Sequence, residues 1–233
     1  MSGGPRQIPL ELGHTVTYGP DSYVIGAANS DAAALIGRWP DWPTPVVAVS
    51  GPPGSGKTHL AHIWAARSGA QLVPAAELGS AGLFETAMGR PVAVDAIEPG
   101  SVPEAALFHL INIVRESGTA LLLLAREPAA GWRVALPDLA SRLRLATAVR
   151  LHEPDEAQLR QVLVKLFADR QLLVERPVLD FVLLRMERSF TAAAALVAAL
   201  DRAALADQRR ISRALAATVL AEIADPAEFQ DRH

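Results

Sequence analysis

Short apolar runs alternate with longer amphipathic segments through the first two thirds of the chain. Within Pro103–Ser117, apolar residues recur at positions 107, 110, 111 and 114, the i, i+3, i+4, i+7 spacing of a helix with one buried face. Helices are also expected over Ser30–Arg38 and Lys57–Arg67. The apolar runs predict strands over Val46–Ser50, Gln71–Pro74, Pro91–Asp95, Thr119–Ala125 and Thr147–Leu151. Strands and helices in alternation predict an α/β fold, with a parallel sheet covered by helices on both faces.

The pattern changes after Pro154, where the remaining periodic segments all predict helices. Asp155 and Gln158 have the spacing of a capping box at the start of the first of these helices. Further helices are expected over Pro177–Met186, over Phe190–Ala206 and after a capping Ser212. We therefore predict four parts, namely a flexible arm at 1–15, an α/β core at 16–152, a small helical lid at 153–225 and a tail at 226–233.

Composition narrows the class of protein. The chain has 233 residues, enough for one α/β domain with a small appended one. It has no cysteine, which excludes disulfides and thiolate metal sites. No run of 18 apolar residues occurs and the start lacks the apolar core of a signal peptide, so we expect a cytoplasmic protein with no membrane partner. The net charge of −3 is unlike that of most domains that bind DNA phosphates.

Residues 51–58 contain the phosphate-loop pattern G-x-x-x-x-G-K-[ST] in full, between a predicted strand and a predicted helix. Its glycines allow the backbone N–H groups to turn inward, and together with the helix N-terminus they form an anion site. Lys57 is expected to reach the β- and γ-phosphates, and the Thr58 hydroxyl to hold Mg²⁺. The candidate cofactor-binding residues of this loop are Gly51, Pro52, Pro53, Gly54, Ser55, Gly56, Lys57 and Thr58.

A second Mg²⁺ contact is expected at Asp95, at the end of an apolar strand, although an aspartate there can also cap a turn. Hydrolytic proteins of this class usually follow that aspartate with a glutamate or aspartate, which orients the attacking water. Here the next residue is Ala96, which cannot do this. Glu98 lies two residues further on, a shift that moves a carboxylate by several ångströms. The chain is therefore predicted to bind nucleotide and to hydrolyse it poorly by itself.

Two arginines are candidates for contacts with phosphate charge. Arg142 lies in a predicted short helix before the last strand, and Arg188 lies just before a lid helix. Each alone is more typical of an exposed, ion-paired arginine. An arginine supplied by a neighbouring subunit, however, can accelerate phosphoryl transfer by several orders of magnitude.

The order of these parts resembles the AAA+ family, and within it the branch of the bacterial replication initiator DnaA. Leu139–Leu143 is similar to the arginine-finger helix of that branch, and Arg188 matches the lid arginine called sensor II. The segment from Tyr18 to Asn29 resembles the part that contacts adenine, with Tyr23, Val24 and Ile25 as the candidate contacts. The resemblance implies a P-loop AAA+ core with a helical lid that binds ADP or ATP with Mg²⁺.

Two features differ from DnaA itself. The chain stops after the lid, where DnaA continues into a helix-turn-helix domain, so no direct sequence-specific DNA binding is expected. The arm contains Gln7-Ile8-Pro9-Leu10-Glu11-Leu12, which resembles the peptide that docks DnaA-related inactivators on the polymerase sliding clamp. Apolar anchors at alternating positions suit an extended peptide in a groove. The candidate clamp-binding residues are Gln7, Ile8, Leu10 and Leu12.

Together these features are similar to the regulatory inactivators of DnaA. That resemblance implies that DnaA and the sliding clamp are partners, and that Arg142 acts in trans on ATP held by DnaA. One departure is Arg126, which stands about where the family has a polar sensor residue. The preferred nucleotide, residual ATPase activity, assembly into a homo-oligomer and the surface that meets DnaA are left open.

Three other functions are considered. An autonomous ATPase of the initiator or helicase-loader branch needs Glu98 as its base. A small-molecule kinase needs an acceptor pocket, and both the helix around Arg142 and the arm argue against it. A structural interaction protein with a vestigial nucleotide site is the third.

Overall fold

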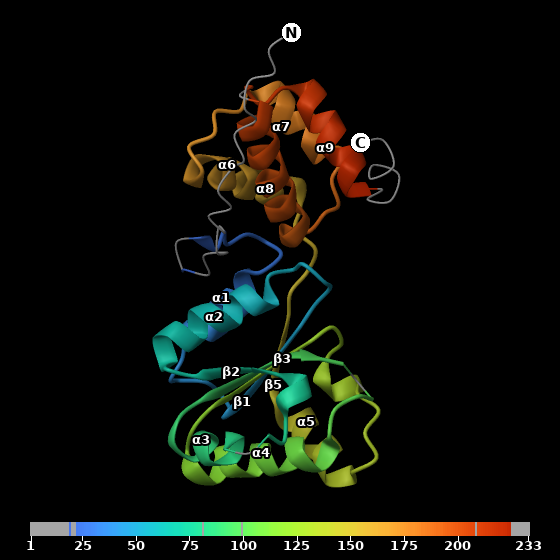
Figure 1. Ribbon diagram of the computed structural model, residues 1–233. Coiled ribbons are helices and arrows are strands. Elements are labelled where there is room, and N and C mark those ends of the chain that lie inside the picture. The colour runs from blue at the N-terminus through green and yellow to red at the C-terminus, as the bar shows by residue number, and fades with distance from the viewer. Residues whose placement is uncertain (1–18, 20–21, 81, 99, 208, 225–233) are drawn as a thin grey trace. The chain divides into compact units, whose positions relative to one another are not determined.

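A computed structural model describes residues 19, 22–80, 82–98, 100–207 and 209–224 (Figure 1). The described residues form two compact units that divide between Gln158 and Leu159, and each unit is described by itself. The predicted arm at 1–15, with its candidate clamp-binding residues, and the predicted tail at 226–233 lie outside the described residues.

The first unit is built on a five-stranded sheet in the order β2-β3-β4-β1-β5. All the pairings are parallel, as the alternating sequence pattern predicts, and Val46 of β1 lies opposite Leu121 of β4. The α/β fold class is therefore confirmed. The strands are β1 (Val46–Ser50), β2 (Gln71–Pro74), β3 (Val92–Ile97), β4 (Leu121–Ala125) and β5 (Thr147–Arg150).

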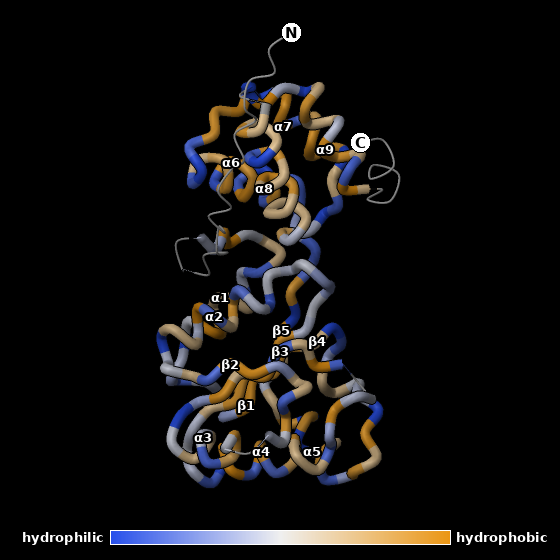
Figure 2. Tube along the Cα trace, in the orientation of Figure 1, coloured by the Kyte–Doolittle hydropathy of each residue, from blue (hydrophilic) through white to orange (hydrophobic). Residues whose placement is uncertain are grey.

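Helices cover both faces of this sheet, with α1 and α2 on one face and α3, α4 and α5 on the other (Figure 1). Val47 and Leu122 face the first group and pack with the fully buried Trp64, whereas Val46 and Leu121 face the second. Burying an aliphatic side chain contributes about 1.5–3 kcal/mol, and the strands are the most continuously apolar part of this unit (Figure 2). The helices are α1 (Ser30–Gly37), α2 (Lys57–Ser68), α3 (Leu83–Gly89), α4 (Glu104–Ser117) and α5 (Pro137–Leu145), with 3₁₀ turns η2 (Ala75–Glu77) and η3 (Ala129–Gly131).

The second unit is helical and has its own apolar core. Phe167, Val182, Leu200 and Val219 are buried in it. Its helices are α6 (Glu156–Asp169), which begins in the first unit, α7 (Arg176–Leu183), α8 (Phe190–Asp207) and α9 (Arg213–Ala224). None of the helices within the described ranges combines the length and apolar character needed to cross a bilayer.

Side-chain caps fix the starts of three of these helices. The N–H of Gln158 donates to Asp155 Oδ1 at 2.7 Å, so half of the predicted capping box forms. The side chain of Gln158 does not complete it but donates to the carbonyl oxygen of Val24 at 3.0 Å. Ser189 caps α8 through the N–H of Ala192, and Ser212 caps α9 as predicted.

Two features of the first unit differ from the sequence expectations. Helix α3 was not predicted, because seven residues are too few to display helical periodicity. Strand β3 was predicted to end at Asp95, but it continues to Ile97. A register shift between Val94 and Ile97 accommodates the extension. The pattern of apolar residues cannot reveal such a shift, because the shift changes the backbone and not the apolar spacing.

Candidate nucleotide site

The strand order brings three segments to one edge of the sheet. Because β3, β4 and β1 are neighbours and parallel, their carboxyl ends lie at the same edge of the sheet. Asp95 lies near the carboxyl end of β3, Arg126 directly follows β4, and the phosphate loop directly follows β1. Ligands of open parallel sheets bind at this edge. The N–H of Gly51 donates to the carbonyl oxygen of Ala125 at 3.2 Å, which ties the start of the loop to the end of β4.

The phosphate loop has the backbone that its sequence predicts. Gly54 and Gly56 have φ angles of 68° and 92°, a region that disfavours residues with a Cβ. Gly56 is also the N-cap of α2. A Cβ on Gly51 would lie 2.8 Å from the carbonyl oxygen of Leu151 and 3.0 Å from Ser55 Oγ, so this position is too tight for a side chain. The loop therefore presents main-chain groups without steric cover at the start of a helix.

The residues of the loop fit a phosphate ligand. The Ser55 hydroxyl is buried and has no hydrogen-bond partner among the residues that the structure describes, which is unusual for a buried polar group. Lys57 Nζ donates to the carbonyl oxygens of Gly51 and Pro52, both at 2.8 Å, so the ammonium lies over the loop. The Ser55 hydroxyl and the Lys57 ammonium can both donate hydrogen bonds to the oxygens of a phosphate bound in the loop.

Thr58 and Asp95 lie together, as a shared Mg²⁺ site requires. The Thr58 hydroxyl donates to Asp95 Oδ2 at 2.7 Å. Mg²⁺ in nucleotide sites keeps several waters and takes only one or two protein oxygens, so these two residues with a phosphate form a suitable donor set. Thr58 and Asp95 would hold the ion, and the ion would supply positive charge that neutralises the charge of a bound phosphate.

Ala96 has an unusual backbone beside this pair. Its φ is 57°, in the left-handed region, and its N–H donates to Asp95 Oδ1 at 2.7 Å. The carboxylate of Asp95 is thus held at both oxygens. The exposed methyl group of Ala96 offers no acceptor for a proton from water.

Arg126 and Glu98 are two charged residues that directly follow neighbouring strands, β4 and β3. Arg126 directly follows β4, and its guanidinium lies 3.9 Å from the carboxylate of Glu98, with about two thirds of each side chain exposed. Burial lowers the pKa of Lys57, the charge of Asp95 raises it, and the charge of Arg126 lowers it. Arg126 therefore adds positive potential to the phosphate site.

The segment predicted to contact adenine lies against the first turn of α2. His59 Nε2 is 3.1 Å from Ser22 Oγ and 3.2 Å from the carbonyl oxygen of Gly19. The His59 ring also meets Tyr23 edge to face at 5.1 Å. Burial raises the pKa of Tyr23 to about 12, so its hydroxyl stays neutral. Ile25 is 62% exposed, which leaves an apolar side chain available for a flat ring.

Two buried amides hold the same segment from behind. The side chains of Asn29 and Gln158 both donate to the carbonyl oxygen of Val24 at 3.0 Å. Asn29 Oδ1 also accepts the N–H of Gly26 at 2.8 Å. The amide of Gln158 packs directly on Gly26, where an added Cβ would lie 2.7 Å from Gln158 Cδ. The contact between Gln158 and Val24 was not predicted, because it joins residues 134 positions apart.

Arg142 lies on α5, whose apolar side is fixed in the core by the buried Leu139 and Leu143. Arg142 itself is half-buried. Within the described part of the chain its guanidinium forms neither an ion pair nor a hydrogen bond. The neighbouring Arg144 differs, since it donates to Ser141 Oγ at 3.1 Å.

Arg188 belongs to the second unit. It is exposed and directly precedes Ser189, the capping residue of α8. Its predicted contact with phosphate stays a prediction, as do the nucleotide and metal roles of the other predicted residues.

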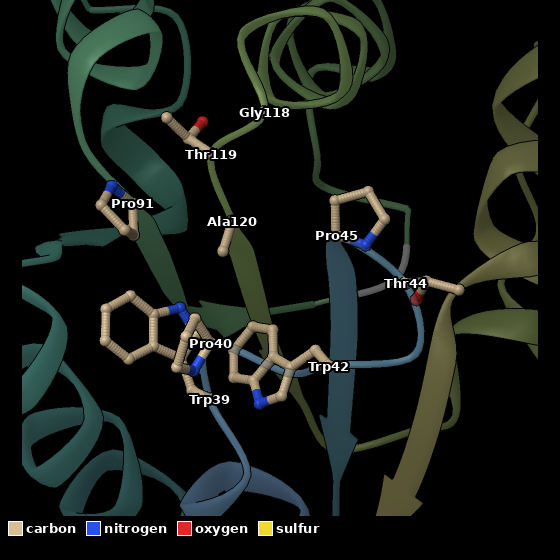
Figure 3. A pocket seen from close by; sticks show the side chains of 9 residues that line it. All are labelled: Trp39, Pro40, Trp42, Thr44, Pro45, Pro91, Gly118, Thr119 and Ala120. Carbon is tan, nitrogen blue, oxygen red and sulfur yellow. The ribbon is translucent and has the colours of Figure 1, made fainter.

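A hollow of about 400 Å³ lies at the opposite edge of the sheet, where β1, β3 and β4 begin (Figure 3). Trp39, Pro40 and Trp42 line one side of it. None of its lining residues is charged, so it does not suit a nucleotide phosphate. The full lining is Trp39, Pro40, Trp42, Thr44, Pro45, Pro91, Gly118, Thr119 and Ala120.

No family model matches this chain. Among solved structures, domain III of the Thermotoga maritima replication initiation protein DnaA is similar, with a TM-score of 0.77 and 16% identity over 88% of this chain and 96% of that chain. AMPPCP-bound DnaA from Aquifex aeolicus has a TM-score of 0.67 and 14% identity over 79% of this chain and 65% of that chain. The RuvB Holliday junction branch migration motor of Thermotoga maritima has a TM-score of 0.61 and 18% identity, with 82% and 64% covered.

These similarities establish the fold. The first unit has the fold that is found in the DnaA and RuvB structures. The chain spans 65% of the Aquifex aeolicus DnaA chain and 64% of this RuvB chain, but 96% of DnaA domain III.

Proposed function

We propose that this chain is a DnaA-related AAA+ regulator of the Hda type. It binds an adenine nucleotide in its own pocket and stimulates hydrolysis of the ATP held by DnaA. In this role it limits re-initiation of chromosome replication. The fold shared with DnaA domain III supports the proposal, since regulator and target then belong to the same architecture.

One observation carries the proposal. A complete phosphate loop and a Thr58–Asp95 pair stand beside an alanine at the position where a hydrolytic protein needs an acid. Such a pocket has what is required to bind a nucleotide with Mg²⁺ and lacks the group that orients water. AMPPCP in the DnaA structure from Aquifex aeolicus supports an adenine nucleotide, ADP or ATP, as the ligand.

Arg142 supplies the activity towards the partner. Its guanidinium has no partner among the described residues, and its helix is anchored in the core by its other side. A positive charge brought to the γ-phosphate of another subunit stabilises the transition state of hydrolysis. Arg188 and Arg126 would act in cis, on the nucleotide of this chain.

The arm completes the proposal. Gln7, Ile8, Leu10 and Leu12 would dock on the polymerase sliding clamp, which places the regulator on replicating DNA. This location is cytoplasmic and needs no sequence-specific DNA contact from the regulator itself. Head-to-tail packing with DnaA, or with a second copy of this chain, would use the surface around Arg142.

An autonomous ATPase is the main alternative, and it requires Glu98 as the base. Two features argue against it. Glu98 lies 3.9 Å from the guanidinium of Arg126, and this ion pair competes with a water molecule for the carboxylate. It also stands beyond Ile97, the last residue of β3.

The test is release of phosphate from DnaA that has been loaded with ATP, in the presence of clamp on DNA. Arg142→Ala is expected to lower the stimulated rate at least 100-fold, because an arginine finger contributes roughly 10³–10⁵ in rate. Its own ADP affinity should stay within about twofold. Arg144→Ala, on the same helix, is the matched control and should retain stimulation. Full stimulation by Arg142→Ala would remove Arg142 from this role.

A further inference from the structure

Glu104, the first residue of α4, holds the segment that leads into α5. Its Oε1 accepts the N–H of Ala135 at 2.8 Å, and its Oε2 accepts the N–H of Leu136 at 2.8 Å. Two consecutive main-chain donors thus meet the two oxygens of one carboxylate. Hydrogen bonds to a charged acceptor are about twice as strong as neutral ones, and two parallel bonds also fix direction.

No side chain of α5 itself caps the start of this helix. Its N-cap residue is Leu136, which has no side-chain oxygen, and Pro137 follows at the first helical position without an N–H. A helix start normally satisfies its free N–H groups with a capping side chain of its own. Here a carboxylate from another helix binds the N-cap residue, so the position of α5 is set relative to α4.

The apolar contacts of α5 fix its rotation about the helix axis. Leu139 and Leu143 are buried, and they determine which side of the helix faces the core. Apolar contacts of this kind are not directional, and they allow sliding more readily than hydrogen bonds do. Glu104 therefore fixes where α5 begins along its axis.

Arg142 depends on this arrangement. Its guanidinium has no ion pair or hydrogen bond among the described residues, so no polar contact there holds the side chain and its location changes with that of α5. A displacement of about 1 Å at a catalytic group can cost about 100-fold in rate. We propose that Glu104 is a positioning residue that sets the reach of Arg142 into the pocket of the partner; this inference rests on the proposed function.

The experiment compares Glu104→Ala, Glu104→Gln and the control Glu116→Ala, an exposed residue on the same helix. Two quantities are measured, the hydrogen exchange of the Ala135 and Leu136 amides and the stimulated hydrolysis of DnaA-bound ATP. Glu104→Ala should speed exchange at both amides and lower the maximal stimulated rate about tenfold or more. The concentration that gives half-maximal stimulation should change less than twofold.

Glu104→Gln keeps one acceptor oxygen, so its exchange and its rate should both be intermediate. Glu116→Ala should match the wild type in both. Unchanged amide exchange in Glu104→Ala would show that Glu104 does not hold the Ala135 and Leu136 amides. Faster exchange with a full maximal rate would show that Glu104 has only a structural role. Full stimulation by Arg142→Ala would instead refute the proposed function, while the exchange result would still report on Glu104.

Discussion

Ala96 affects the candidate nucleotide site in two ways. The methyl group leaves the pocket without a base, and the left-handed backbone turns the Ala96 N–H onto Asp95. Left-handed geometry costs a residue with a Cβ roughly 1–2 kcal/mol. A hydrogen bond to a carboxylate contributes about 1.5–3 kcal/mol, which is enough to offset that cost. The Mg²⁺ candidate Asp95 is therefore oriented by the residue that replaces the base.

His59 is expected to make the folding stability of the protein depend on pH. Burial lowers its pKa below the ordinary 6.5, the charge of His62 lowers it further, and the hydrogen bond to the Gly19 carbonyl raises it. Below pH 6.5 the unfolded chain then binds more protons than the folded chain, so folding stability falls as the pH falls towards the lowered pKa. The wild type should lose stability between pH 7.5 and 5.5, and His59→Gln should lose less, as judged by urea midpoints at each pH.

The exposed His152 offers a matched control, because its replacement by glutamine should leave the pH dependence of the wild type in place. An equal loss of stability on acidification in the wild type and in His59→Gln would show that His59 does not link pH to folding.

At the scale of elements, the sequence predicts best where a pattern is local. The strands and α2, α4 and α8 were found within a few residues of their ends, because apolar runs and helical spacing are visible in one segment. Helix α3 is too short for such a signal. The phosphate loop was found because its glycines and lysine all lie within one short segment of the sequence. The observed backbone of the loop agrees with that pattern.

Contacts between distant elements had no such signal. The carboxylate of Glu104 binds amides 31 and 32 residues away, and the amide of Gln158 binds a carbonyl 134 residues away. A glutamate at the start of a helix is ordinary for dipole reasons alone, so its sequence position does not reveal a partner. These contacts follow from the strand order, which places the ends of distant segments together.

The contact between Gln158 and Gly26 can be tested directly. Gly26→Ala should lower the free energy of unfolding by about 1–3 kcal/mol, because the added methyl group displaces the buried, hydrogen-bonded Gln158 side chain. In a Gln158→Ala background the same change should cost less, by a coupling of about 0.5–3 kcal/mol. Urea denaturation of the four chains measures this cycle.

Gly37→Ala is the control, since nothing lies within 4 Å of its added methyl group. It should change stability by no more than about 1 kcal/mol. Additive effects of Gly26→Ala and Gln158→Ala would contradict the steric account.

At the scale of the whole molecule, the chain combines parts with separate tasks. The first unit holds the phosphate loop, the candidate Mg²⁺ pair and the helix that carries Arg142, and the second unit carries Arg188. In the proposed function, the arm binds the clamp, the pocket of this chain retains its nucleotide, and the pocket of DnaA performs the hydrolysis. The account therefore predicts an asymmetry between two pockets with the same fold.

The most direct measurement of that asymmetry places γ-labelled ATP in one pocket at a time and follows labelled phosphate in a single turnover. With label in DnaA and ADP in this chain, clamp on DNA should give rapid release that Arg142→Ala abolishes. With label in this chain and no DnaA, release should stay at the uncatalysed background. Rapid release from this chain alone, lost in Glu98→Ala, would contradict the account.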